Sequence, residues 1–274
     1  MEVQVAVAQV PVSWDINQNL AAITRVLADA QRGEIVVLPE ACVSGYDDNL
    51  SRLDRLDPDA VAGVLDRLAE VAASKCIHLF CGSLLFDHDA WWNAAIYLSP
   101  DGRRWTYRKI NLATHERGRL SAGDELPTLR LDLDGGFLTV GVQLCREVLF
   151  PEQWQQLADA GAQVFIYLTH AANPDVPAGV WRSHLISHAA ANQRFVVAAN
   201  VVDRRQHCPS AVISPRGEVL GELPAGQSRV LRTVIDTAEI ASWYLGQRRT
   251  DLLHLHYRGG ALQAGAPACP IGGL

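Results

Sequence analysis

The 274-residue chain lacks the features that mark several large classes of protein. Its net charge is −6 and its basic residues form no block, so we expect no nucleic-acid partner. It has no apolar run long enough to span a bilayer and no signal-peptide pattern, so we expect a cytoplasmic protein without membrane contact. Its six cysteines lie far apart with no C-x-x-C pair, which argues against a zinc ribbon and against a disulfide framework.

Motifs that hold a cofactor or a metal are also missing. There is no glycine-rich phosphate loop, no dinucleotide fingerprint and no G-x-S-x-G turn. His184 and His188 have the spacing of a metal pair on a helix, but the adjacent glutamate of a zinc peptidase is absent, so we interpret them as packed or surface residues. His254 and His256 lack a third ligand. The sequence therefore predicts neither a metal nor a cofactor.

Lysine is scarce, because only Lys75 and Lys109 appear among 24 basic residues. Lys75 ends a helix-like run. We interpret its presence as chance in a sequence whose basic residues are nearly all arginine. Lys109 ends a strand-like run among apolar residues. An ammonium is a compact point charge that can approach a developing oxyanion closely, whereas a guanidinium is a planar fork. Lys109 is therefore a candidate functional residue.

Three strand-like runs each finish on a chemically potent side chain. The side chains are the carboxylate of Glu40, the amine of Lys109 and the thiol of Cys145. A covalent thiol hydrolase needs a base, an electrostatic clamp and a nucleophile on a rigid frame. The runs are 35–40, 104–109 and 138–145.

The rest of the chain alternates between strand-like and helix-like runs, and its 49% hydrophobic content suits a sizeable core. Asp57 and Pro58 have the positions of an N-cap and a first helical residue. The alternation is typical of an α/β protein. We expect strands at 3–9, 35–38 and 163–169, and helices at 17–32, 58–73, 151–160 and 178–192.

Two expected hairpins share a Ser-Pro-x-Gly turn, in which proline presets φ and glycine accepts a positive φ. They cover 94–103 and 210–218 and favour two sheets of related build that face each other. From about residue 259 the sequence is rich in glycine, alanine and proline. We therefore expect a single domain over 1–258 and a flexible tail over 259–274.

Several short motifs follow one another over roughly residues 3–257. They are Leu38-Pro39-Glu40 with Ser44-Gly45-Tyr46, Tyr107-Arg108-Lys109, Glu116 with Gly123-Asp124, Cys145-Arg146-Glu147 with Phe150-Pro151-Glu152, Trp181, Ala191-Asn192-Gln193, and Arg248-Arg249. Each motif is weak alone, but the ordered set is specific and resembles the nitrilase or carbon-nitrogen hydrolase superfamily. The resemblance implies a four-layer αββα sandwich of two facing sheets.

The resemblance also implies roles for four residues. Cys145 corresponds to the nucleophile, Glu40 to the general base, Lys109 to the oxyanion stabiliser, and Glu116 to a second carboxylate that orients substrate and lysine. The chemistry of the residues agrees, because a thiol with a pKa of about 8.5 is mostly protonated at neutral pH and needs a base or a cation to react. As in the family, a backbone N–H near Cys145 is expected to complete the oxyanion hole.

The residues after the nucleophile depart from the family pattern. Many family amidases have Cys-x-Asp, whereas this chain has Cys145-Arg146-Glu147. We interpret Glu147 as a structural hydrogen-bonding residue. Arg146 either binds a substrate carboxylate or forms a surface ion pair. The candidate substrate-binding residues are Tyr46, Arg146, His170 and Ala171.

These observations favour a hydrolase of carbon–nitrogen bonds other than peptide bonds, acting on a small linear amide such as an ω-amide or a carbamoyl compound. In the family that the chain resembles, branches that act on nitriles usually carry a longer C-terminal extension, so we favour an amide over a nitrile. A nitrilase and an amide-dependent acyltransferase stay open as alternatives. A catalytically silent binding module is disfavoured because Glu40, Lys109 and Cys145 are all present. No papain-like or caspase-like sequence surrounds Cys145. The resemblance further implies a homodimer formed through helices near 151–160 and 178–192.

Overall fold

The computed structural model describes residues 1–249 and 251 and contains two six-stranded sheets. The first sheet has the order β12-β1-β2-β3-β4-β5, and the second has the order β11-β10-β9-β8-β7-β6. The strands of the first sheet are β12 (Arg229–Asp236), β1 (Glu2–Gln9), β2 (Ile35–Val37), β3 (His78–Asp87), β4 (Ala90–Leu98) and β5 (Arg104–Arg108). Those of the second are β11 (Val219–Glu222), β10 (Ala211–Ile213), β9 (Phe195–Asn200), β8 (Val164–Thr169), β7 (Gly136–Leu144) and β6 (Thr128–Leu133).

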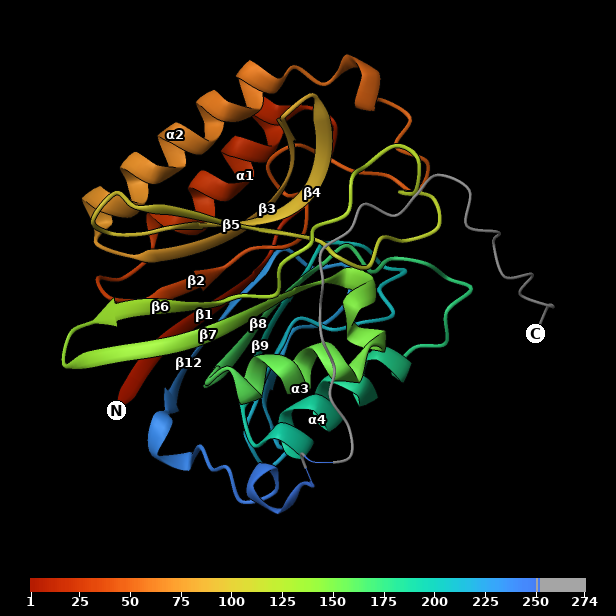
Figure 1. Ribbon diagram of the computed structural model, residues 1–274. Coiled ribbons are helices and arrows are strands. Elements are labelled where there is room, and N and C mark those ends of the chain that lie inside the picture. The colour runs from red at the N-terminus through yellow and green to blue at the C-terminus, as the bar shows by residue number, and fades with distance from the viewer. Residues whose placement is uncertain (250, 252–274) are drawn as a thin grey trace.

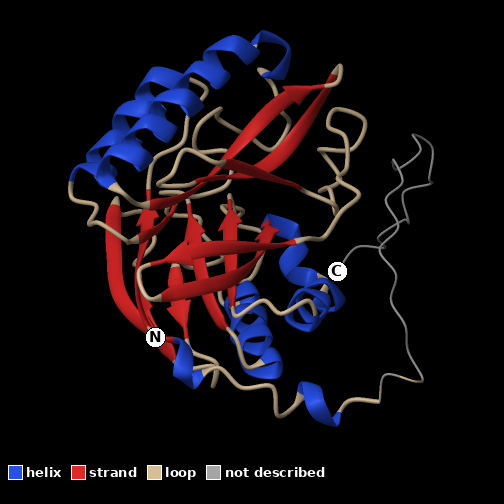
Figure 2. Cartoon of the chain, turned by 60° about the vertical axis from the view of Figure 1, so that its left-hand side comes forward, coloured by secondary structure: helices blue, strands red, loops and turns tan. Residues whose placement is uncertain are grey.

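Helices cover the outer face of each sheet (Figures 1 and 2). Helices α1 (Ile16–Ala28) and α2 (Pro58–Lys75) pack on the first sheet, and α3 (Pro151–Asp159) and α4 (Val180–Asn192) pack on the second. The expected four-layer αββα sandwich is confirmed. The short 3-10 helices are η1 (Leu53–Arg55), η2 (Cys145–Leu149), η3 (Thr237–Glu239) and η4 (Leu245–Gln247).

The alternation of side chains along each strand builds three hydrophobic layers. In β1, Val3, Val5 and Val7 face the second sheet, whereas Ala6 and Ala8 face the α1 and α2 layer. Strand β8 repeats the pattern, with alternate residues in the layer between the sheets and in the layer under α3 and α4. Both faces of the central strands are therefore buried, and side chains from both sheets pack in the layer between them.

Most of the expected element boundaries are confirmed. The side chain of Asp57 caps α2 by accepting from the N–H of Asp59, and the two Ser-Pro-x-Gly hairpins are β4–β5 in one sheet and β10–β11 in the other. The helix expected to reach residue 32 is too long by four residues, because α1 ends at Ala28. Gly33, at a φ of 78°, starts the turn into β2, which a continuing helix would abolish.

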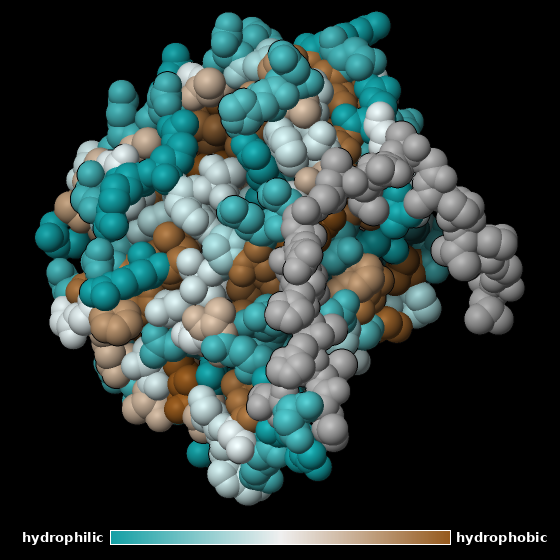
Figure 3. Space-filling model, viewed as in Figure 1, coloured by the Kyte–Doolittle hydropathy of each residue, from teal (hydrophilic) through white to brown (hydrophobic). Residues whose placement is uncertain are grey.

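Other expectations are not decided by the structure. The flexible tail and the pair His254 and His256 lie outside the described residues, and the twofold contact through α3 and α4 needs a second copy, so it stays a prediction. On the face shown in Figure 3, hydrophilic side chains gather over the α1 and α2 layer, and hydrophobic side chains show as small separate patches. None of the helices in the described ranges is long and apolar enough to cross a membrane.

Gly82 of β3 makes room for the segment that follows β2. A Cβ atom on Gly82 would lie 2.3 Å from the nitrogen of Ala41 and 2.5 Å from the Cα of Glu40, distances that no real side chain shows. The backbone of Glu40 is therefore positioned by a glycine on the neighbouring strand.

We expect Gly82→Ala to lower the free energy of unfolding by at least about 2 kcal/mol, because the new methyl group meets backbone atoms that cannot move aside. Gly63→Ala is the matched control, since Gly63 lies exposed within α2 and a Cβ atom added there would have no other atom within 4 Å. The control should stabilise the protein by about 0.5–1 kcal/mol, as alanine does in a helix interior. Urea unfolding of both variants measures the difference, and equal effects would contradict the packing argument.

Candidate active site

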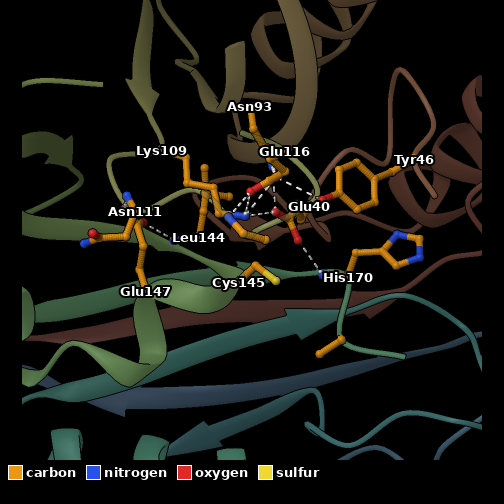
Figure 4. Close-up of polar contacts among 12 residues, drawn as sticks. Glu40, Tyr46, Asn93, Lys109, Asn111, Glu116, Leu144, Cys145, Glu147 and His170 are labelled. Atoms are coloured by element: carbon orange, nitrogen blue, oxygen red, sulfur yellow. Dashed lines mark hydrogen bonds and ion pairs between the residues drawn. The ribbon is translucent and has the colours of Figure 1, made fainter. Parts of the chain in front are cut away.

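The structure brings the ends of four strands together at one place between the sheets. Glu40 follows β2 and Lys109 follows β5 in the first sheet, while Cys145 follows β7 and His170 follows β8 in the second. Figure 4 shows their side chains and backbone groups converging there. The structure therefore brings the three candidate residues Glu40, Lys109 and Cys145 to one place.

Lys109 is fixed by its backbone on both sides. Its N–H donates to the carbonyl of Asn93 at 2.8 Å, and its own carbonyl accepts from the N–H of Gly123 at 2.8 Å. Tyr107, two residues earlier, belongs to the layer between the sheets, so Lys109 continues that face toward the second sheet. A Cβ atom on Gly123 would lie 2.2 Å from the carbonyl of Arg108, which explains the glycine at that position.

The ammonium of Lys109 lies between two carboxylates (Figure 4). Its Nζ atom donates to Oε1 of Glu40 and to Oε1 of Glu116, both at 3.0 Å, and all three side chains are fully buried. The Nζ atom also lies 3.0 Å from Oε2 of Glu116, so three carboxylate oxygens surround the ammonium, which has three N–H groups. The two carboxylates and the ammonium together leave one negative charge.

The pKa values in this cluster follow from its charges. Burial alone would lower the pKa of Lys109, but the carboxylates of Glu116 and Glu40 outweigh burial and raise the pKa above its ordinary value. Burial also opposes the charge of Glu116, yet the Lys109 ammonium and the N–H group of Ala113 hold its pKa below the ordinary value. Lys109 and Glu116 therefore remain charged at neutral pH.

Cys145 occupies a strained turn. It begins η2 directly after β7 and has a φ of 45°, in the left-handed region that residues other than glycine rarely adopt. The hydroxyl of Tyr167 donates to the Cys145 carbonyl at 2.6 Å and holds this conformation. Such strain costs about 1–3 kcal/mol and is frequent at functional sites.

The Cys145 thiol is protonated at rest. Burial raises its pKa to about 12, the carboxylate of Glu40 adds to the rise, and the Lys109 ammonium opposes it. The hydroxyl of Thr169 lies near enough to lower the pKa slightly, and it has no other partner among the described residues. A nucleophile in this state needs a base that takes its proton as it attacks.

Glu147 joins the cysteine turn to the lysine segment. Its Oε2 accepts from the N–H of Leu144 at 2.8 Å, and its Oε1 accepts from the Tyr107 hydroxyl at 2.8 Å and from the N–H groups of Ile110 and Asn111 at 2.8 and 3.2 Å. The interpretation of Glu147 as a structural hydrogen-bonding residue is confirmed.

Of the four candidate substrate-binding residues, Tyr46 and His170 lie closest to the charged cluster. The Tyr46 hydroxyl donates to Oε1 of Glu116 at 2.9 Å, and its ring centroid is 5.3 Å from that of His170. The N–H of His170 donates to Oε2 of Glu40 at 2.8 Å. Burial lowers the pKa of His170, so its imidazole is neutral and offers an uncharged hydrogen bond.

The other two candidates, Arg146 and Ala171, lie in different surroundings. Ala171 is buried in the layer under α3 and α4, and its N–H and carbonyl are both bonded to the side chain of Asn200. Arg146 is exposed next to Cys145 and forms no ion pair with any described residue. Of the two possibilities for Arg146, the surface ion pair is therefore not found in this part of the chain.

Three residues of the site were not identified from the sequence. Asn93 contacts both Glu40 and Glu116, the Nε2 atom of His115 lies 2.6 Å from the Tyr46 hydroxyl, and Thr169 lies beside Cys145. For two of them the place in the sequence was a weak indication of a role in the site, because Thr169 ends β8 and His115 directly precedes Glu116. Nothing in the sequence distinguishes Asn93 from other strand residues.

The histidine pair on α4 is packed rather than open. His188 is buried, its Nε2 atom bonds to the carbonyl of Val148 at 2.8 Å, and its ring stacks on Trp154. Residues 1–249 and 251 contain no group of three or more histidine, cysteine or acidic side chains that could hold a metal ion. Five cysteines in these ranges are free, and Cys42, Cys81 and Cys208 among them are buried.

The fold is that of the nitrilase superfamily. The crystal structure of Nit3 from Saccharomyces cerevisiae, a member of branch 10 of that superfamily, superimposes with a TM-score of 0.73, covering 92% of this chain and 96% of Nit3 at 24% identity. An amidase from Nesterenkonia sp. superimposes with a TM-score of 0.77, covering 91% and 94% of the two chains at 23% identity.

Sequence comparison agrees with the fold. The family model described as carbon-nitrogen hydrolase matches residues 4–245, so the chain belongs to the carbon-nitrogen hydrolase family and is an enzyme of that class. A nitrilase of Pyrococcus abyssi is 28% identical over 80% of this chain and 84% of its own length. A 2-oxoglutaramate amidase of Bacillus subtilis is 29% identical over 78% and 82%.

We expect alkylation of Cys145 by iodoacetamide to accelerate about tenfold per pH unit from pH 7 to pH 10 without a plateau, because the thiol pKa of about 12 leaves the thiolate rare throughout. Glu40→Gln removes a negative charge that raises this pKa, so the same curve should shift to lower pH. Mass spectrometry of the Cys145 peptide measures both rates. A plateau below pH 9 in the wild type would contradict the burial of the thiol.

Proposed function

We propose that this enzyme hydrolyses a small linear amide through a covalent thioester on Cys145. The observation that carries the proposal is the buried ammonium of Lys109, shared by Glu40 and Glu116, at the strand ends where the protonated thiol lies. This arrangement supplies a nucleophile, a base and a cation in one buried site.

In acylation, the sulfur of Cys145 attacks the carbonyl carbon of the amide while Glu40 takes the thiol proton. The oxygen then carries the negative charge of the tetrahedral intermediate. The ammonium of Lys109 stabilises this charge, together with the first N–H groups of η2, which have no partner inside that helix. Glu40 then gives its proton to the nitrogen, the carbon–nitrogen bond breaks, and ammonia leaves.

In deacylation, Glu40 takes a proton from a water molecule, whose oxygen attacks the thioester carbonyl. The second tetrahedral intermediate uses the same stabilising N–H groups. It collapses with cleavage of the carbon–sulfur bond, and the sulfur recovers the proton from Glu40. In this scheme Glu116 keeps Lys109 in place and does not exchange protons, because its pKa is held low.

Relatives support the choice of an amide. The Bacillus subtilis relative is an amidase, and mutants of the Nesterenkonia amidase in which one glutamate is replaced show covalent addition of the acetamide moiety of fluoroacetamide at the active-site cysteine. The Pyrococcus abyssi relative is a nitrilase. A nitrile would enter through the same thiol attack, so matched amides and nitriles belong in one assay.

The exposed guanidinium of Arg146 favours a substrate with a carboxylate. It lies one residue from the nucleophile and has no ion-pair partner among the described residues, so an incoming carboxylate would meet it without displacing another acid. The name of the Bacillus subtilis relative refers to an amide that also carries a carboxylate. We therefore place small acid-bearing amides among the better substrates, ahead of neutral amides of equal size.

Lys109→Arg should lower kcat by about 10²–10³, the loss typical of removing one oxyanion donor, because the planar fork cannot take the place of the ammonium between the two glutamates. Cys145→Ala, which leaves the charged cluster intact, should release no ammonia at all. Ammonia release from a panel of small amides, carbamoyl amines and nitriles is measured after circular dichroism confirms folding. A tenth or more of wild-type kcat in Lys109→Arg would contradict the assigned role.

Arg146→Ala should reduce kcat/KM for an acid-bearing amide by about tenfold or more and leave a neutral amide of the same length nearly unchanged, because a charge-assisted hydrogen bond is lost only with the former. Arg25→Ala, an exposed arginine on α1, is the matched control and should change neither value. An equal effect on both substrates would assign Arg146 a structural role, and a preference for the matched nitrile would overturn the amide assignment.

A further inference from the structure

Asn93 makes contacts that a purely structural residue in β4 does not need. Its Nδ2 atom donates to Oε1 of Glu40 at 2.8 Å and to Oε1 of Glu116 at 2.6 Å, and the side chain is fully buried. These are the same two oxygen atoms that receive the ammonium of Lys109. Figure 4 shows Asn93 approaching the two carboxylates beside the lysine.

The orientation of the Asn93 amide follows from these partners. Turned the other way, its oxygen would face two carboxylate oxygens. In the observed orientation both N–H groups are used, whereas the Oδ1 atom is buried without a hydrogen-bond partner among the described residues. A buried acceptor without a partner is rare and unfavourable. The contacts with the two glutamates therefore explain why an asparagine occupies position 93.

We propose that Asn93 is a positioning residue that keeps Glu40 and Glu116 ionised side by side, an inference that rests on the proposed function of the site. Two carboxylates that share one ammonium repel each other, and such pairs tend to bind a proton. The amide places one N–H on each carboxylate and offsets this repulsion. Glu40 then stays free to accept the thiol proton of Cys145.

Other titratable groups lie near the carboxylate pair and also influence its protonation. The nearest are Lys109 after β5, Cys145 after β7 and His170 after β8. Tyr46 contacts Glu116, His115 contacts the Tyr46 hydroxyl, and Tyr167 of β8 lies at longer range. None of these groups adds a second positive charge at neutral pH in contact with Glu40, because burial lowers the pKa of His170.

The backbone carbonyl of Asn93 accepts a hydrogen bond from the N–H of Lys109. That bond does not depend on the side chain, so substitutions at position 93 can leave the lysine backbone in place. The test uses Asn93→Leu, which has the same number of side-chain heavy atoms, the same branch point and no donor, and Asn93→Asp, which has the same shape and a carboxylate in place of the amide.

The measurement is the pH dependence of kcat/KM on an amide that the wild type hydrolyses. The acid limb of this profile reports the ionisation of the essential carboxylates of the free enzyme. In Asn93→Leu the limb should move upward by about one pH unit or more, with activity recovering toward the wild-type value at higher pH. In Asn93→Asp it should move farther. A uniform loss at every pH, with the limb in place, would reduce Asn93 to a structural residue.

Asn111→Leu is the matched control, since Asn111 lies two residues after Lys109 and its side chain bonds to Gln153 rather than to either glutamate. Its acid limb should coincide with that of the wild type. A shift equal to that of Asn93→Leu would overturn the proposal.

Alkylation of Cys145 by iodoacetamide provides a readout that needs no substrate. If Asn93→Leu lets the carboxylate pair bind a proton, negative charge beside the thiol falls and alkylation at pH 7 should be several-fold faster than in the wild type. An unchanged rate would overturn the proposal. If the wild type hydrolyses none of the compounds tested, the proposed function fails, and this rate alone still decides the role of Asn93.

Discussion

The buried carboxylate of Glu147 connects the two halves of the site. It accepts one hydrogen bond from the strand that leads to Cys145 and three from the segment around Lys109, which belongs to the other sheet. Hydrogen bonds to a charged group contribute roughly 1.5–3 kcal/mol each, and a buried N–H left without a partner costs a similar amount. The distance between the amine and the thiol is therefore set by one side chain as well as by the packing of the sheets.

The charged cluster is costly to bury, and its composition explains how the resting enzyme remains stable. A buried charge that loses its partner typically costs about 3–5 kcal/mol of stability. Lys109 has two carboxylate partners, so its ammonium is paired on two sides. Burial raises the pKa of the Cys145 thiol and the negative charge of Glu40 raises it further, so the thiol is protonated at rest. In the proposed mechanism, the thiol reacts only as Glu40 takes its proton.

The sequence was sufficient for the parts of the structure that depend on local pattern. Strand-like runs that finish on Glu40, Lys109 and Cys145 were identified in the sequence, and the resemblance carried by the ordered motifs implied the sandwich. Asn93 was missed because its role depends on the register of β4 and β5, which sets its carbonyl opposite the N–H of Lys109. The bonding of Ala171 to Asn200 is equally hidden, because it joins residues 29 positions apart.

The hydrogen bonds of the site also separate chemistry from recognition. The oxygens of Glu40 and Glu116 already accept bonds from Lys109, Asn93 and backbone N–H groups, so little of the buried cluster is left to recognise a substrate. Tyr46 belongs to this cluster, because its hydroxyl donates to Glu116, whereas Arg146 is exposed beside Cys145 and bonds to neither glutamate. In the proposed function, discrimination among acyl groups therefore depends on residues outside the cluster, such as Arg146, rather than on the groups that hold Glu40, Glu116 and Lys109 together.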